Sequence, residues 1–195
     1  MDSGVPRTVR CRGGAGRNGG AVEYVGIGCC VLVGLVFAAA AIGKARSAAA
    51  LREFAGTLVA GRLVARRWRM PVAVAVSVAE AGIAVLVAVP ATGRLGLAAA
   101  AVLAVGFVAG IQVTVVRGAR IPCVCFGSGS DRAMGRGYQI RNLLLAGCAL
   151  LGVVAGGHTG VGGLRTDGVV VAVAAGVLLA ALVIRGDDLA ALRVS

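Results

Sequence analysis

Residues 95–116 read LGLAAAAVLAVGFVAGIQVTVV, a run without a single charged side chain. An apolar stretch of about 18 or more residues is long enough to cross the roughly 30 Å hydrocarbon layer of a bilayer as an α-helix. A helix also satisfies its own backbone hydrogen bonds, which the water-free bilayer core requires. This stretch therefore predicts a transmembrane helix in an integral membrane protein.

The rest of the chain repeats this pattern. It has 195 residues, of which 58% are hydrophobic and 14% charged, whereas about a quarter of the residues in soluble domains are charged. Four further apolar runs occupy residues 24–43, 70–90, 141–158 and 168–185. None alternates as the strands of a membrane β-barrel do. We therefore expect an all-α, multi-pass transmembrane helical bundle, with a four-helix membrane domain at 21–158 and a fifth span at 168–185.

The charged residues flank these runs and do not form a domain of their own. The formal net charge is +12, but cations next to apolar spans are the ordinary pattern of membrane proteins, so we do not expect nucleic-acid binding. Residues 1–20 are rich in Gly and Arg and are interpreted as a disordered basic tail. Residues 186–195 are interpreted as a polar tail.

The segment between the first two spans reads SAAALREFAGTLVAGRLVARRWRM, residues 47–70. Its arginines keep mostly to one side, and helical spacing places apolar residues on the other, so the pattern predicts an amphipathic interfacial helix with Trp68 near headgroup level. The alternative is a solvated linker. The apolar face would comprise Leu51, Phe54, Ala55, Leu58 and Val59.

A second feature stands between the third and fourth spans, where residues 121–130 read IPCVCFGSGS. Cys123 and Cys125 lie in a polar loop shortly after Arg117 and Arg120, and nearby cations favour the reactive thiolate. The three cysteines inside the spans, Cys29, Cys30 and Cys148, are expected to pack as small apolar residues.

Three kinds of chemistry suit two cysteines one residue apart. A disulfide between them would be strained, and strained disulfides are the readily exchanging ones. Two thiolates can also bind a soft metal such as Cu(I) or Zn²⁺, although they do not complete a tetrahedral zinc site and the single histidine, His158, lies beyond the next span. The third reading is a structural pair without chemistry.

Glu80 is the one acid well inside a span. An ionisable group within the membrane is a functional candidate by default. Lys44 and Arg141, near the ends of other spans, are its candidate partners. Glu80 could accept a proton coupled to thiol chemistry, or it could simply fix helix packing.

The order of these features resembles the MauE family of methylamine-utilisation membrane proteins, in the wider DoxX-like group. The family pattern places a Lys after the first span, then a Phe, a Glu in the second span, a CxCFG loop and an Arg-Asn pair opening the next span. The resemblance extends from about Val22 to Ala155, and the CxCFG-to-Arg-Asn block is its specific part. The matching positions are Lys44, Phe54, Glu80, CVCFG at 123–127, and Arg141-Asn142.

This resemblance implies a DoxX-like four-helix fold and a role in disulfide chemistry. The namesake of the family supports maturation of the disulfide-rich small subunit of methylamine dehydrogenase and is paired with a thioredoxin-like protein. By resemblance, Cys123 and Cys125 would be the exchanging pair, presented by Phe126 and Gly127, with a thioredoxin-like protein and an exported disulfide-containing client as partners. Lys44, Glu80, Arg141 and Asn142 would support them.

Other readings stay open from sequence alone. A membrane quinone is one candidate electron acceptor, but apolar spans do not reveal a quinone pocket. The chain could also be a non-catalytic accessory membrane subunit, or a soft-metal transport component that uses the cysteine pair. Whether it is an enzyme in its own right is therefore left open.

Two observations favour opposite sides of the membrane for the cysteine loop. The loops after the first and third spans share one side and carry most of the cations, which by the positive-inside rule favours the cytoplasm. Disulfide formation, however, belongs to oxidising compartments. From the redox argument and the resemblance we predict an extracytoplasmic loop.

Overall fold

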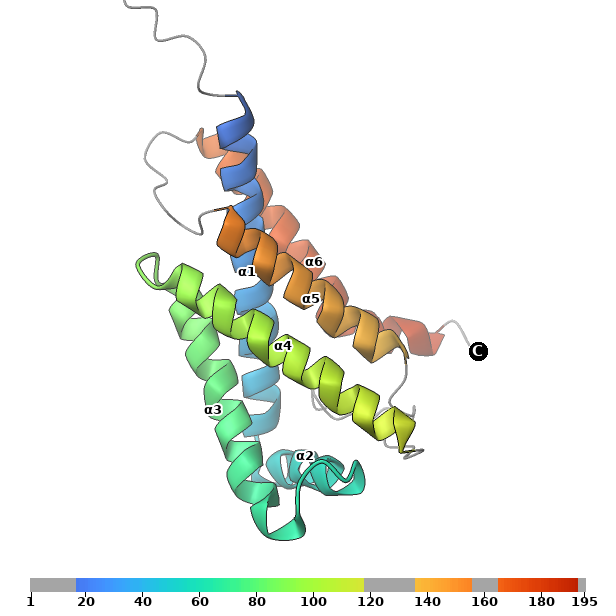
Figure 1. Ribbon diagram of the computed structural model, residues 1–195. Helices are drawn as coiled ribbons and strands as arrows, with labels where there is room; N and C mark the ends of the chain where they lie inside the picture. The colour runs from blue at the N-terminus through green and yellow to red at the C-terminus, as the bar shows by residue number, and fades with distance from the viewer. Residues whose placement is uncertain (1–16, 118–135, 156–164, 193–195) are drawn as a thin grey trace, which may run out of the picture.

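The computed structural model describes residues 17–117, 136–155 and 165–192 (Figure 1). Within these ranges the chain is helical. The elements are α1 (Arg17–Ala45), α2 (Ala48–Ala60), the 3-10 helix η1 (Arg66–Trp68), α3 (Arg69–Ala88), α4 (Gly93–Val116), α5 (Arg136–Val154) and α6 (Thr166–Leu192).

The helices confirm the predicted all-α, multi-pass membrane bundle. Four of those described, α1, α3, α4 and α6, are long and apolar enough to cross a bilayer, and α5 contributes a shorter apolar helix at Tyr138–Val154. α1 begins at Arg17 and α6 continues to Leu192, so both helices extend into segments that we expected to be tails. Apolar side chains cover the outside of the bundle, as expected for a surface that faces lipid; Val78, Val85, Val102 and Leu178 are each more than 60% exposed.

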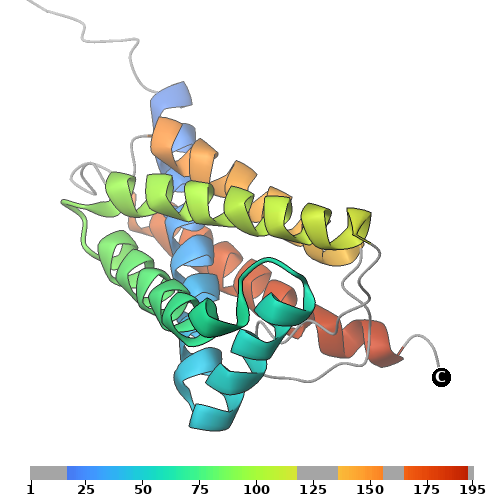
Figure 2. The same cartoon turned by 60° about the horizontal axis from the view of Figure 1, so that its bottom comes forward.

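The chain runs back and forth between two ends of the bundle. α1 leads to α2, which lies across one end, and α3 returns to the other end, where it turns into α4 (Figures 1 and 2). α4 and α5 then lie side by side, and α6 runs along α1. The last turn of α4 and the first turn of α5 both lie toward the end that carries α2, which we call the α2 end.

A close helical hairpin joins α3 and α4 through the short turn between Ala88 and Gly93. A Cβ added at Gly96 would lie 2.7 Å from the backbone nitrogen of Val87. Only glycine allows this approach without a shift of one helix. The hydroxyl of Thr92 donates a hydrogen bond of 2.9 Å to the carbonyl of Leu86 and closes the turn.

The core lies where α1, α3, α4 and α5 meet. Val33, Leu97 and Ala149 are fully buried there, together with Cys30. α6 packs against α1 through small residues, since a Cβ added at Gly176 would lie 2.8 Å from the carbonyl oxygen of Gly28. Such close contacts are how helices associate in lipid, where apolar burial alone gives little preference for protein over lipid.

The predicted interfacial helix is present as α2. Ser47 caps it by accepting a hydrogen bond of 3.0 Å from the backbone N–H of Ala50. Phe54 and Ala55 are buried against Ala73 of α3. Trp68, in η1, is about half exposed, as expected for an aromatic side chain at the membrane surface.

Candidate functional site

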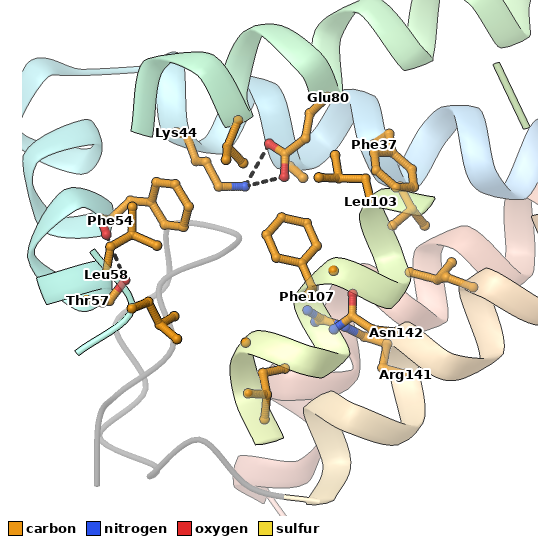
Figure 3. A pocket seen from close by; sticks show the side chains of 18 residues that line it. Phe37, Lys44, Phe54, Thr57, Leu58, Glu80, Leu103, Phe107, Arg141 and Asn142 are labelled. Atoms are coloured by element: carbon orange, nitrogen blue, oxygen red, sulfur yellow. Dashed lines mark hydrogen bonds and ion pairs between the residues drawn. The ribbon is translucent and has the colours of Figure 1, made fainter. Parts of the chain in front are cut away.

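A buried ion pair joins α1 to α3. The Lys44 ammonium donates to both carboxylate oxygens of Glu80, each at 2.7 Å (Figure 3). Each side chain is only 1% exposed. Of the two partners that the sequence left open for Glu80, the structure selects Lys44. A buried charge requires such a partner, because an isolated one is strongly destabilising inside a protein or a membrane.

The aromatic ring of Phe54 brings α2 into the same cluster. The Lys44 Nζ lies 4.9 Å from the centroid of this ring, which is a cation–π distance. Phe54 is itself buried, and the hydroxyl of Thr57, one turn later, donates to its carbonyl at 2.7 Å. Three helices are thus tied together around one ammonium group.

This cluster lines a cavity of about 310 Å³, with walls from α1, α2, α3, α4 and α5. Arg141 and Asn142 of α5 also line it. In Figure 3 they lie on the side opposite Lys44 and Glu80, with the ring of Phe107 between them in this view. The structure therefore brings together, around one space, five of the positions singled out in the sequence: Lys44, Phe54, Glu80, Arg141 and Asn142.

Arg141 and Asn142 occupy a different helix position from the one expected. We predicted that they open the fourth span, but α5 begins at Arg136, so they lie in its second turn and do not cap it. The Asn142 side-chain amide donates to the carbonyl of Tyr138 at 2.8 Å. The Arg141 guanidinium lies 5.1 Å from the centre of the Tyr138 ring. These local contacts fix both side chains on the face of α5 that borders the cavity.

Gly106 and Gly110 form part of the cavity wall. Glycines four residues apart can bring two membrane helices close together, yet a Cβ added at Gly106 would meet nothing within 4 Å. A Cβ at Gly110 would meet only the Leu63 side chain, at an ordinary 3.6 Å. The glycines thus leave space beside α4 and do not mediate close packing.

Sequence reasoning missed Phe107, which projects into this space from α4. One available signal was the scarcity of its residue type. The chain has only four phenylalanines, and three of them, Phe37, Phe54 and Phe107, line the cavity. Aromatic side chains commonly line small-molecule pockets, although Phe37 and Phe54 here also pack within the hydrophobic core.

The predicted redox residues Cys123, Cys125, Phe126 and Gly127 lie outside the described residues. Cys29 and Cys30 are buried and Cys148 is half-buried, as expected for packing residues. In the ranges that the structure describes, no three His, Cys, Asp or Glu side chains come together to hold a metal.

The helix ends that flank the segment with the cysteine pair lie near the cavity. They are the end of α4 and the start of α5. Arg117, at the end of α4, donates a hydrogen bond to the carbonyl of Arg62, the residue before the cavity-lining Leu63. On the other side of the segment, Gln139 of α5 donates to Gln112 of α4 at 2.6 Å. Both attachment points therefore lie at the α2 end, next to the cavity.

Comparison with known proteins identifies the family. The family model described as methylamine utilisation protein MauE matches residues 22–155. The chain belongs to the MauE family. The methylamine utilization protein MauE of Paracoccus denitrificans is 35% identical over 122 residues, which cover 62% of this chain and 63% of that protein. No solved structure matches the chain.

The MauE match begins in α1 and ends just after α5. It therefore includes every helix that lines the cavity, and it leaves out α6. The MauE relative is matched over less than two thirds of its own length. The family resemblance read from the sequence is confirmed, and the protein is a multi-pass membrane protein of this family.

Proposed function

We propose that this MauE-family membrane protein acts in methylamine utilisation, where it supports disulfide formation in an exported partner together with a thioredoxin-like protein. The observation that carries the proposal is the convergence of Lys44, Glu80, Arg141 and Asn142 on one cavity beside both attachment points of the CxC segment. Ionisable side chains within a membrane are costly to bury and commonly mark functional sites.

The proposed reaction is thiol–disulfide exchange. A thiolate of the thioredoxin-like protein attacks the disulfide between Cys123 and Cys125, and a mixed disulfide forms while one cysteine leaves as a thiolate. The second thiol of the thioredoxin-like protein then displaces the remaining cysteine. The partner gains a disulfide, which it passes to the client, and the cysteine pair ends as a dithiol. An acceptor of two electrons and two protons must then reoxidise the pair.

Lys44 and Glu80 would support this reaction from within the bundle. Their ion pair joins α1 to α3, and the Phe54 ring adds α2, so the group keeps the α2 end in one geometry. Glu80 is in addition the described acid closest to the middle of a span, which makes it the proposed acceptor for a proton released from the thiols.

The exchange would take place on the extracytoplasmic side, where oxidising conditions maintain disulfides. The charge pattern opposes this placement, because exposed Arg66, Arg67 and Arg69 lie at the α2 end and favour the cytoplasm. These arginines flank an amphipathic helix, and anionic headgroups bind such cations on either face of a membrane.

The test is the double substitution Cys123→Ser/Cys125→Ser in the host organism. We expect the variant to insert normally while free thiols accumulate in the exported client and growth on methylamine fails. Cys148→Ser is the matched control, since it removes one half-buried thiol of α5 and keeps the CxC pair. Thiol trapping followed by gel electrophoresis measures client oxidation.

Two other outcomes would replace the proposal. Unchanged client oxidation and growth would indicate an accessory membrane subunit with an inert cysteine pair. Altered sensitivity to copper or mercury with normal client disulfides would indicate soft-metal handling.

A further inference from the structure

We propose that the cavity at the α2 end binds the ring of a membrane quinone, which serves as the electron acceptor for the cysteine pair. This inference rests on the proposed function, because that function requires an oxidant that is soluble in the bilayer. The binding itself is argued only from described residues.

The size and walls of the cavity suit a ring that bears an apolar tail. Its volume of about 310 Å³ is at the lower end of the range for small-molecule pockets, roughly 300–1,000 Å³. Val36, Leu103 and Leu145 give it apolar walls, and its helices form part of the membrane-spanning bundle. Such walls suit a ligand that dissolves in the bilayer.

Two aromatic rings are placed to hold a flat ligand. Phe54 lies beside Lys44, and the Phe107 ring projects from α4 toward the same space (Figure 3). Aromatic rings pack against other rings in stacked or edge-to-face arrangements. Gly106, directly before Phe107, leaves the adjoining wall open because its missing side chain would meet nothing within 4 Å.

The polar groups match the carbonyl oxygens of a quinone. Lys44 has three N–H donors, and the two oxygens of Glu80 accept two of them. Asn142 has two amide N–H donors and uses one toward Tyr138. The Lys44 ammonium also has the Phe54 ring as a neighbour, so the donor that remains is the second N–H of Asn142. An acyl chain would leave this donor without an acceptor, which is unfavourable for a buried polar group.

The same groups also suit the reduced ligand. The hydroxyls of a quinol are donors, and the carboxylate of Glu80 and the side-chain oxygen of Asn142 can accept from them. The charge of Lys44 is balanced by Glu80, which favours an uncharged ligand over a free anion.

The reaction balances in electrons and protons. The dithiol of Cys123 and Cys125 becomes a disulfide and gives up two electrons and two protons. The quinone takes up the same two electrons and two protons and becomes a quinol. The quinol leaves into the bilayer, and the disulfide is ready for the next exchange.

Binding is tested with decylubiquinone on the full chain in lipid nanodiscs. We expect saturable binding at one site, and binding about tenfold or more weaker for decylbenzene, which keeps the tail and a ring but lacks the carbonyls. Gly106→Leu fills the cavity and should lower decylubiquinone affinity by about tenfold or more. Gly82→Leu is the matched control, because Gly82 is also an open helix glycine but faces outward from α3.

The variants and the two ligands distinguish a failure of this inference from a failure of the proposed function. Cys123→Ser/Cys125→Ser should bind decylubiquinone normally but should not support its reduction by a thioredoxin-like dithiol. Equal binding of decylbenzene would overturn the inference in favour of an acyl chain, and unchanged affinity in Gly106→Leu would overturn the assignment of this cavity. Normal quinone binding with unchanged client disulfides in the double cysteine variant would retain the binding site and reject the proposed function.

Discussion

Glycine has opposite effects in two regions of the molecule, the contact between α1 and α6 and the cavity at the α2 end. Along α1 and α6, glycines remove side chains so that two backbones touch, and a Cβ at Gly176 would meet the Gly28 carbonyl at 2.8 Å. At the α2 end, Gly106 removes a side chain and leaves space. The first region is held by dense packing. The second contains a buried ion pair, Lys44–Glu80, beside the open space.

This difference separates a closely packed part of the molecule from a part that leaves a cavity. Dense small-residue packing stabilises a helix pair in lipid without any chemistry. A cavity bordered by buried ionised groups costs stability and is retained where a function requires it. The MauE match follows the same division, since it includes the helices of the cavity and ends before α6.

The largest expected effect comes from breaking the ion pair. Lys44→Met leaves the Glu80 carboxylate buried without its cation and should lower the free energy of unfolding by about 3–5 kcal/mol. Lys44→Met/Glu80→Met removes both charges and should recover most of that loss, because a buried pair replaced by apolar residues is often close to neutral. Denaturant titration in detergent micelles measures both. A loss of about 1 kcal/mol or less in the single variant would mean that the pair is solvated.

An intermediate effect distinguishes the two kinds of glycine. Gly176→Ala should destabilise the protein by about 1–3 kcal/mol, because the added methyl group meets the backbone of α1. Gly106→Ala adds the same group to open space and should be neutral, or stabilising by up to about 1 kcal/mol through helix propensity. The same titration compares them. Equal effects at both positions would show that the cavity is as closely packed as the α1–α6 contact.

The smallest expected effect is at the end of the bundle away from α2. The hydroxyl of Tyr24 in α1 accepts a hydrogen bond of 3.1 Å from the backbone N–H of Arg165, next to α6. Tyr24→Phe should cost about 0.6 kcal/mol, the average for an interhelical hydrogen bond in a membrane protein. Thermal unfolding in micelles detects this change. A loss as large as that of Lys44→Met would contradict the view that the strongest polar contact of the described residues lies at the α2 end.

The helices could be predicted from the sequence because membrane spans depend on length and hydropathy alone. The run at 95–116 lies within α4 at Gly93–Val116, and the amphipathic pattern around Phe54 corresponds to α2. The start of α5 was harder to predict from the sequence. Polar residues such as Gln139 and Arg141 interrupt the apolar pattern, so hydropathy placed the start of the span five residues after Arg136, where the helix begins.

The site was predicted in its residues but not in its arrangement. Lys44, Glu80, Arg141 and Asn142 were singled out by their charge or by family resemblance, and they meet at one cavity. That Glu80 pairs with Lys44 depends on how α1 and α3 pack, which residue spacing does not determine. Phe107 was overlooked because a phenylalanine in an apolar span is indistinguishable by pattern from a lipid-facing one.

The central claim is that Cys123 and Cys125 form an exchangeable disulfide on the outer face. It is tested most directly by thiol labelling with a membrane-impermeant maleimide on intact cells, in a variant that keeps only these two cysteines. Our account predicts labelling only after treatment with a reductant. Labelling only after cell lysis would place the pair in the cytoplasm, in agreement with the distribution of arginines, and would contradict the account.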